Sequence, residues 1–274
     1  MTTESLFNAF YLNVHGAAET MQDDWEQRYV PSPSSVASCR LRQWFMASGL
    51  ERTNRIPVES LKKMESGRVI EDYWREVYTR AGFLVVSPLP PVEIGAMKSR
   101  GGDGLLFVEH QRAVEATGLP KGSSLLLELK DLGAWTYMDF VLKGCQEGMP
   151  DYYDQVQSYL RAYDREYCIV HAGMADASGT KWIWSKIKRQ PEVIPPFWVE
   201  RVKRDPVRTM EVLNRAAEVH WAIENVAPSD RIPIELKDFD SVKLVPDHKY
   251  PCGYCGFSDT CVRASTSAAL RIVQ

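Results

Sequence analysis

The sequence has no long apolar run. No stretch of about 18 consecutive apolar residues occurs, so nothing in it indicates a membrane-spanning helix. The first residues lack the basic start and apolar stretch of a secretory signal, and no internal repeat or low-complexity tract occurs. Cysteines are few: six in 274 residues do not form the dense framework of a secreted disulfide-rich domain. We therefore expect a cytoplasmic protein without a membrane partner, in which clustered cysteines bind metal.

Neither charge is in large excess. The net charge of −3 counts against a protein that coats nucleic acid non-specifically. Local basic patches with interleaved aromatic residues, such as KWIWSKIKR, are typical of a single-strand binding groove, and equally of solvated helix and hairpin faces. A composition with 45% hydrophobic and 25% charged residues is that of an ordinary globular protein, long enough for one large domain or two small ones.

Apolar periodicity and the positions of Gly and Pro predict helices before and after a group of strands. Helices are expected over residues 3–28, from a Ser cap in 31–35 through Cys39 to about Ala47, and over 57–81, 134–144, 151–164 and 196–226. Strands are expected in FLVVSP, PVEI, GLLFVE and SLLLELK, and a hairpin in YCIVHAGMAD with TKWIWSKIKR. This pattern predicts an α/β fold with a mixed sheet flanked by helices. The expected regions are an N-terminal helical region (residues 1–82), a core (83–190) and a C-terminal region (191–274), forming one compact unit.

The centre of the sequence carries charged residues where apolar ones would be expected. Asp103 follows a Gly pair at the start of one strand, and Glu128 and Lys130 lie at the end of another. Alternation along a strand places Glu128 and Lys130 on the face that Leu126 directs into the core. Burying this pair costs desolvation free energy. Glu128 and Lys130 should therefore pair with each other, or bind a metal or a substrate. Two carboxylates, a hard cation and a Lys are what metal-assisted phosphodiester hydrolysis requires, although a surface ion pair is the simpler interpretation.

Two helical motifs accompany this set. Gln155 and Tyr159 are four residues apart on one helix face, and both carry groups able to reach a phosphate or a terminal base. Glu71 follows Gly67 by four residues, and the glycine is expected to let this helix approach the strands closely. Glu71 would then add a third carboxylate. The plainer interpretations are an exposed Gln, a core Tyr and a solvated acidic turn.

The order of these motifs resembles a known family. Gly-x3-Glu, Gly-Asp-Gly, Glu-Leu-Lys and Gln-x3-Tyr occur in this order in the RecB-like branch of the PD-(D/E)XK nucleases, and the sequence resembles the CRISPR-associated exonucleases of that branch and the nuclease domain of AddB. The resemblance covers about residues 31 to 262. It implies a restriction-endonuclease-like mixed sheet.

The resemblance also implies roles for the residues above. Asp103 and Glu128 would bind Mg2+ or Mn2+, and the backbone carbonyl of Leu129 would complete the metal site. Lys130 would be the catalytic lysine. The Gln-x3-Tyr motif of residues 155 and 159 is associated with DNA positioning. Glu71 stands where many members have His, and it would be the first metal ligand.

Three cysteines near the end of the sequence have the spacing C-x2-C-x5-C: Cys252, Cys255 and Cys261. A metal site of thiolates normally needs four ligands. The resemblance implies that Cys39 is the fourth, and that the four hold a [4Fe–4S] cluster joining the N- and C-terminal helical regions. Zinc is the alternative, but structural zinc ligands usually come as two close pairs. Cys145 and Cys168 are then expected to be buried small apolar side chains.

The function expected from these features is a metal-dependent deoxyribonuclease. It would act as an exonuclease on single-stranded DNA ends, in recombination and repair or in CRISPR spacer acquisition, with a CRISPR integrase or recombination proteins as partners. One alternative is a catalytically weak DNA-binding or scaffolding subunit, although such a protein has no need for a charged cluster on a core face. Another alternative is a zinc-stabilised interaction domain without nuclease activity.

Overall fold

The computed structural model describes residues 30–50, 58–174, 197–226 and 255–261. The chain divides into two compact units. The sheet unit comprises Pro31–Ala37 and Ser66–Ala217, and the cysteine unit comprises Met1–Val30, Ser38–Glu65 and Glu218–Gln274. The predicted helix over residues 3–28 lies outside the described residues. No helix in the described ranges is long and apolar enough to cross a membrane.

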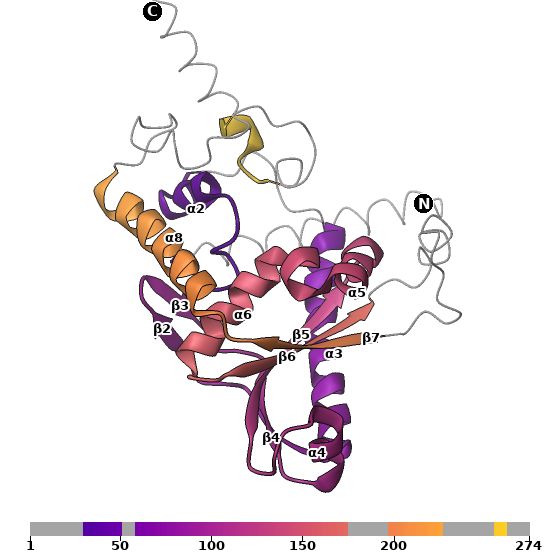
Figure 1. Ribbon diagram of the computed structural model, residues 1–274. Helices are drawn as coiled ribbons and strands as arrows, with labels where there is room; N and C mark the ends of the chain where they lie inside the picture. Colours follow the sequence, from indigo (N-terminus) through magenta and orange to yellow (C-terminus); the bar gives the residue numbers. More distant parts are fainter. Residues whose placement is uncertain (1–29, 51–57, 175–196, 227–254, 262–274) are drawn as a thin grey trace, which may run out of the picture. The chain divides into compact units, whose positions relative to one another are not determined.

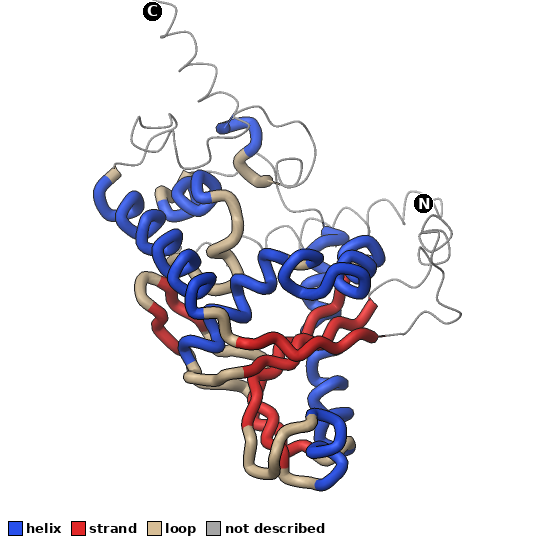
Figure 2. The backbone as a smooth tube through the Cα atoms, in the orientation of Figure 1, coloured by secondary structure: helices blue, strands red, loops and turns tan. Residues whose placement is uncertain are grey.

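The sheet unit is built on a five-stranded mixed sheet with the strand order β1-β4-β5-β6-β7 (Figures 1 and 2). Neighbouring strands are antiparallel except β5 and β6, which are parallel and are connected through helices α5 (Ala134–Gly148) and α6 (Pro150–Ala162). Parallel strands need a long crossover, and the two helices supply it. The predicted α/β class, with a mixed sheet flanked by helices, is confirmed. The strands are β1 Phe83–Val86, β4 Gly104–Val108, β5 Ser124–Leu132, β6 Tyr167–Met174 and β7 Phe197–Lys203.

Helices pack against both faces of this sheet. Helix α3 ends before Gly82, whose φ of +97° favours glycine, and its Trp74 and Tyr78 pack on one face beside the leucines at odd-numbered positions of β5. The other face, which includes Leu126, packs against α5 and α6 (Figure 1). Each sheet face therefore has its own apolar core. The helices are α3 Val58–Arg80, α5 Ala134–Gly148 and α6 Pro150–Ala162.

Two short elements were not predicted from the sequence. Strand β3, Met97–Ser99, pairs with β2, Val92–Ile94, in a two-stranded antiparallel sheet. Helix α4, Gln111–Thr117, lies in the connection between β4 and β5. Elements of three and seven residues are too short to establish a periodic pattern.

The prediction of one helix over 196–226 is wrong. Phe197–Lys203 form the strand β7, and the helix α8 is Pro206–Asn225. The helix starts late because Pro206 is suited to a first turn, and because Asp205 Oδ1 accepts the N–H groups of Val207 and Arg208 at 2.9 and 3.0 Å. The second arm of the predicted hairpin lies outside the described residues, and in the described ranges β6 pairs with β5 and β7.

Two smaller predictions are also wrong. Helix α2, Arg40–Ala47, has Cys39 at its N-cap rather than a serine, and Ser32 and Ser35 form a separate turn with a backbone hydrogen bond of 2.9 Å. A Cβ added at Gly67 would meet no described atom within 4 Å, so this glycine does not serve a close approach of α3 to the strands in the described part of the chain.

Candidate active site

Strand β5 places Glu128 and Lys130 on the face that packs against α5 and α6. Leu126 and Leu132 of this strand belong to the same face, whereas Leu127 and its odd-numbered neighbours point to the α3 side. Glu128 is only 2% exposed, and its carboxylate contacts the ammonium group of Lys130. The structure therefore places this pair where the alternation of strand residues predicts it.

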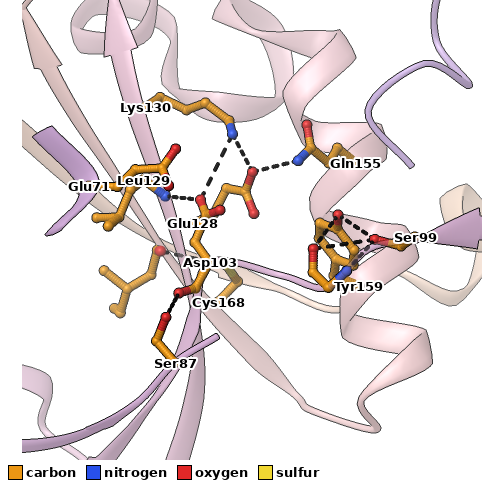
Figure 3. Close-up of polar contacts among 12 residues, drawn as sticks. Glu71, Ser87, Ser99, Asp103, Glu128, Leu129, Lys130, Gln155, Tyr159 and Cys168 are labelled. Carbon is orange, nitrogen blue, oxygen red and sulfur yellow. Dashed lines mark hydrogen bonds and ion pairs between the residues drawn. The ribbon is translucent and has the colours of Figure 1, made fainter. Parts of the chain in front are cut away.

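Asp103 lies in the turn before β4 and faces β5. Its Oδ2 accepts a hydrogen bond from the backbone N–H of Leu129 at 2.7 Å and lies 4.0 Å from Nζ of Lys130 (Figure 3). Its main-chain carbonyl accepts hydrogen bonds from Ser87 Oγ at 2.9 Å and from Arg75 Nε at 3.2 Å. Both the backbone and the side chain of Asp103 are thus fixed, so its carboxylate is positioned by the fold itself.

The turn that carries Asp103 requires a glycine. Gly101 has a φ of +127°, and a Cβ at this position would lie 2.2 Å from the carbonyl oxygen of Leu89. A larger residue would therefore be strained and would displace the backbone. Of the Gly pair seen in the sequence, Gly101 serves this close approach.

Tyr159 of helix α6 and Tyr163, the residue that follows this helix, hold the same turn. The hydroxyl of Tyr159 donates to the carbonyl of Gly101 at 3.1 Å and lies 2.9 Å from Ser99 Oγ (Figure 3). The hydroxyl of Tyr163 accepts the N–H of Gly102 at 3.1 Å. Tyr159 is 7% exposed, so its hydroxyl supports the turn before Asp103, a contact that the sequence motif did not indicate. The association of Tyr159 with DNA stays a prediction.

Helix α6 also contacts the charged pair. Gln155 Nε2 donates to Glu128 Oε1 at 2.6 Å, so Glu128 is held by Gln155 and Lys130 together (Figure 3). Lys130 Nζ lies 5.3 Å from the centroid of the Tyr152 ring, within the range of a cation–π interaction. Tyr152 was not predicted. It precedes Gln155 by three residues, and helical neighbours at this spacing share a face, which is the signal that could have found it.

Glu71 approaches the site from helix α3. Its carboxylate is half-buried and accepts a hydrogen bond from Arg75 Nη2 at 3.1 Å, whereas Asp72 is exposed and pairs with Arg75 Nη1 at 2.6 Å. Arg75 therefore connects Glu71 with the backbone of Asp103, and it was not identified from the sequence. Its position four residues after Glu71, on the same helix face, is the signal that the sequence contains.

The carboxylates influence one another electrostatically. Burial, and next the negative charge of Asp103, raises the pKa of Glu128 to about 7, although Lys130 opposes the change. Burial and the charge of Asp103 also raise the pKa of Glu71. For Lys130, burial lowers the pKa, but Glu128 and Asp103 outweigh it and raise the value, so the ammonium stays charged. When the carboxylates of Glu71, Asp103 and Glu128 are all ionised, the two cations of Lys130 and Arg75 do not neutralise them, and the site then attracts a further cation.

The donor chemistry of this site fits a hard divalent cation. Within the described ranges, no three His, Cys, Asp or Glu side chains form a group that could hold a metal ion. Glu71 is instead paired with Arg75, and Glu128 with Lys130. The carboxylates of Asp103 and Glu128 and a main-chain carbonyl such as that of Leu129 are the oxygen ligands that Mg2+ and Mn2+ prefer. A cation between the two carboxylates would offset the repulsion that raises the pKa of Glu128.

The cysteines fall into two groups. In the cysteine unit, Cys39, Cys255 and Cys261 are half-buried and pack against one apolar cluster, while Cys252 lies outside the described residues. The sheet unit buries the other two cysteines, as predicted: Cys145 and Cys168, 0% and 1% exposed. The apolar cluster is formed by Leu41, Trp44, Phe45, Ala222 and Phe257.

No protein-family model and no curated protein sequence matches this chain. Among solved structures, it is similar to an alkaline exonuclease, LHK-Exo, from Laribacter hongkongensis, with a TM-score of 0.46 and 16% identity over 72% of this chain and 89% of that chain. The complex of LHK-Exo with dAMP aligns with the same score and identity, over 72% and 91%. The protein SSO0001 aligns with a TM-score of 0.44 and 13% identity over 94% and 97%. Scores of this size do not carry residues or an activity from one protein to another.

Proposed function

We propose that this chain is a deoxyribonuclease that hydrolyses phosphodiester bonds with Mg2+ or Mn2+ as its cofactor. The observation that carries the proposal is the meeting of Asp103, Glu128 and Lys130 on a core face, with Glu128 almost fully buried. A core has no structural need for such a group, because apolar residues of similar volume are often as stabilising as a buried ion pair. The motif order that resembles the PD-(D/E)XK nucleases supports the same chemistry.

Each side chain of the site has a role in this reaction. When bound, the divalent cation supplies an activated water and neutralises charge on the phosphate. Asp103 and Glu128 would hold the cation, with Glu71 and the carbonyl of Leu129 as further ligands. Lys130 keeps its proton and offsets the negative charge that develops on the phosphate oxygens.

Helix α6 positions these groups. Gln155 donates to Glu128 and so fixes the direction of this carboxylate. Tyr159 holds the turn before Asp103 through the carbonyl of Gly101. A carboxylate displaced by about 1 Å can reduce the rate by a factor on the order of 100. The contacts of Gln155 and Tyr159 therefore matter for the reaction, because they position the carboxylates of Glu128 and Asp103.

We assign single-stranded DNA ends as the substrate, so that the enzyme is an exonuclease. The support is the resemblance to the RecB-like exonucleases and the basic segments with interleaved aromatic residues. We assign this exonuclease activity to DNA recombination and repair, or to spacer acquisition in CRISPR-based antiviral defence. A CRISPR integrase or recombination proteins would then be partners.

We further propose that Cys39, Cys252, Cys255 and Cys261 hold a structural [4Fe–4S] cluster. The support is the resemblance, together with the position of the three described cysteines against a single apolar cluster in the cysteine unit. A metal site formed only in the folded state adds its binding free energy to the stability of the fold.

The activity is tested with end-labelled single-stranded DNA in Mg2+ or Mn2+, with EDTA as the metal-free control. Three single variants should each reduce the rate of DNA cleavage by about 100-fold or more, because each removes a group that holds the cation or stabilises developing charge. They are Asp103→Ala, Glu128→Ala and Lys130→Ala. Lys143→Ala is the matched control, since this exposed lysine pairs with Asp139 on helix α5. Its activity should equal that of the wild type.

The same assay separates the alternatives. Full activity of Lys130→Ala would exclude the site. Binding of DNA without hydrolysis would identify a binding or scaffolding subunit, and a zinc-containing protein inert toward DNA would identify an interaction domain. Blocking the 5′ end and then the 3′ end of the substrate determines the polarity of cleavage.

A further inference from the structure

An aromatic stack lies at the start of strand β7, outside the catalytic set. The ring of Phe197 stacks on the imidazole of His171, with centroids 5.0 Å apart and an interplanar angle of 14°. Trp74 of helix α3 contacts both rings, with centroid distances of 4.1 Å to His171 and 5.1 Å to Phe197. Tyr73 packs edge-on against Trp74 at 5.2 Å. We call these four residues the β7 aromatic cluster.

The cluster has a buried side, formed by His171, and a side that is exposed to solvent, formed by Phe197 and Tyr73. His171 is 2% exposed, and its Nδ1 lies 3.0 Å from the hydroxyl of Tyr78. Burial lowers the pKa of His171 to about 4, so the ring beneath Phe197 is neutral at physiological pH. Phe197 and Tyr73 remain 41% and 61% exposed. One face of Phe197 is therefore held in place by His171, and the ring still presents a large apolar area to solvent.

The cluster lies on the α3 side of the sheet, and it adjoins the candidate active site through Glu71 of helix α3. Trp74 follows Glu71 by three residues on helix α3, so the two side chains lie one turn apart. A Cβ built at Gly173 would lie 3.5 Å from Trp74 Nε1 and 3.8 Å from the carbonyl oxygen of Lys130. The indole ring thus lies against Gly173 of β6, which pairs with Asp131 of β5, the residue after Lys130.

We propose that Phe197, supported by His171 and flanked by Trp74, is a stacking platform for a nucleobase of single-stranded DNA whose phosphate is held at the Asp103, Glu128 and Lys130 site. This inference rests on the proposed function. Every base has a π-face, so stacking on an aromatic ring retains a strand without reading its sequence. A rigid, uncharged ring stack loses little conformational entropy when a base is added to it.

The platform selects single strands over duplex DNA. Bases inside a duplex are already stacked and paired, whereas those of a single strand have free faces. An open aromatic ring beside a phosphodiester site is therefore matched to the unpaired end of a strand.

The test uses single-stranded oligonucleotides that carry the fluorescent base 2-aminopurine at successive positions. Ca2+ replaces Mg2+, because it takes the same oxygen ligands at longer distances, and gel analysis of each sample shows that no cleavage occurs. Wild-type protein should quench 2-aminopurine strongly at one position near the bound end. Phe197→Ala should abolish this quenching and raise the Kd by roughly 5- to 150-fold, the range for loss of one base–aromatic stack.

Three further variants make the result specific. Phe197→Trp should retain the quenching and the affinity, whereas Phe197→Leu should lose both, because leucine keeps apolar area but has no ring. Leu84→Ala is the matched control, since Leu84 is a 54% exposed apolar residue on β1, the strand at the opposite edge of the described sheet. Its Kd should be that of the wild type. An abasic nucleotide at the quenched position should make wild-type protein and Phe197→Ala bind equally.

Each remaining outcome overturns the proposal. Unchanged affinity and quenching in Phe197→Ala, or full affinity in Phe197→Leu, excludes base stacking at this ring. Loss of affinity in Trp198→Ala but not in Phe197→Ala would move the contact to the opposite face of β7. If the wild type hydrolyses DNA but these results fail, only the platform is excluded. If the wild type neither binds nor hydrolyses single strands, the proposed function fails with it.

Discussion

At the scale of single residues, Arg75 has an organising position in the candidate site. One guanidinium donates to the carboxylates of Glu71 and Asp72 and to the main-chain carbonyl of Asp103. Its planar group allows several directed hydrogen bonds at once, which a lysine ammonium at the same position could not reproduce. The relative position of Glu71 and Asp103 therefore depends on a residue that is itself outside the catalytic set.

The position of Glu71 leads to a prediction about two adjacent acidic residues. Glu71 is half-buried and near the charges of Asp103 and Lys130, whereas the side chain of Asp72 is 81% exposed. Glu71→Ala should weaken the affinity for Mn2+ and slow DNA cleavage, though less than Asp103→Ala, while Asp72→Ala should have little effect. Titration of cleavage rate against Mn2+ concentration measures both changes. A severe loss in Asp72→Ala with a silent Glu71→Ala would contradict this assignment.

Glu71→His gives a second test of the same ligand. Imidazole is softer than a carboxylate, so this variant should keep partial activity and shift the metal preference from Mg2+ toward Mn2+ or Co2+. Relative rates in the three metals measure this shift. An unchanged order of metals would show that residue 71 does not contact the cation.

His171 predicts a pH dependence of stability. Its pKa is lowered from 6.5 to about 4 by burial, so between these values the unfolded chain binds a proton that the folded protein does not. The free energy of unfolding should therefore fall as the pH falls through this window, by about 2 kcal/mol between pH 7 and pH 5 from this residue alone. Urea unfolding at both pH values measures it, with His171→Gln as the variant in which this part of the decrease disappears. An equal decrease in both proteins would contradict the prediction.

Four of the residues predicted from the sequence share one property: local spacing determines where they point. Alternation along one strand placed Glu128 and Lys130 on the same face, and a helical turn placed Gln155 and Tyr159 together. Tyr163 and Ser87 were missed because their partners, Gly102 and Asp103, are distant in sequence or belong to a turn without periodicity. Contacts of that kind depend on the tertiary structure and leave no local pattern.

At the scale of elements, helix α6 is held from both sides. Its Gln155 and Tyr159 face the candidate site, while Asp154 and Gln157 face the connection from β7 to α8. Gln157 donates to the carbonyl of Lys203 at 3.0 Å and accepts the N–H of Asp205 at 2.7 Å. The connection therefore anchors the helix that positions Glu128.

The strongest anchor is the pair of Asp154 and Arg208. Arg208 donates through Nε and Nη2 to both carboxylate oxygens of Asp154, at 2.6 and 2.9 Å, and Asp154 is 5% exposed. Arg208→Met should lower the free energy of unfolding by about 2 kcal/mol, because it leaves a buried carboxylate without its charged partner. Arg204→Met is the control, since its ion pair with the exposed Asp164 should contribute less than about 1 kcal/mol.

Chemical denaturation of the two variants compares these values directly. DNA cleavage measured on the same samples should fall in Arg208→Met and not in Arg204→Met, because only the first changes the support of α6. Equal stability of the two variants would show that the pair does not anchor the helix.

The elements that the sequence predicted incorrectly lie where two patterns join. FWVERVK was assigned to a helix because an amphipathic helical pattern follows it directly, yet the open edge of β6 pairs with it as β7. Tertiary pairing decides such cases, since strand propensity depends on the neighbouring strand. The predicted end of helix α3 is correct because a glycine, Gly82, follows the helix and terminates it locally.

At the scale of the whole molecule, the cysteines divide between the two units. Replacement of any one of the four proposed cluster ligands by serine should remove iron and visible absorbance from anaerobically purified protein. These variants are Cys39→Ser, Cys252→Ser, Cys255→Ser and Cys261→Ser. The control variants are Cys145→Ser and Cys168→Ser, whose side chains are buried in the sheet unit and should leave the iron content unchanged.

Metal analysis and unfolding together measure this prediction. Loss of the cluster should destabilise the cysteine unit, because metal binding and folding are coupled. Stoichiometric zinc in place of iron, or loss of iron in Cys168→Ser, would contradict the assignment of the four ligands.

The division into units has a consequence for the order in which a newly made chain matures. Phe45 and Phe257, whose rings lie 5.6 Å apart in the cysteine unit, are translated far apart in time, whereas every residue of the sheet unit has been made once Ala217 is added. At about 5–20 residues per second, residues 218–274 follow over several seconds, long enough for the sheet unit to fold first. Cofactor insertion at the cysteines would then be the last step of biogenesis. A nascent chain that stalls after residue 226 would carry every side chain of the proposed nuclease site but only Cys39 of the four proposed cluster ligands. Its release from the ribosome, followed by a DNA cleavage assay, would show whether the proposed activity requires the second unit.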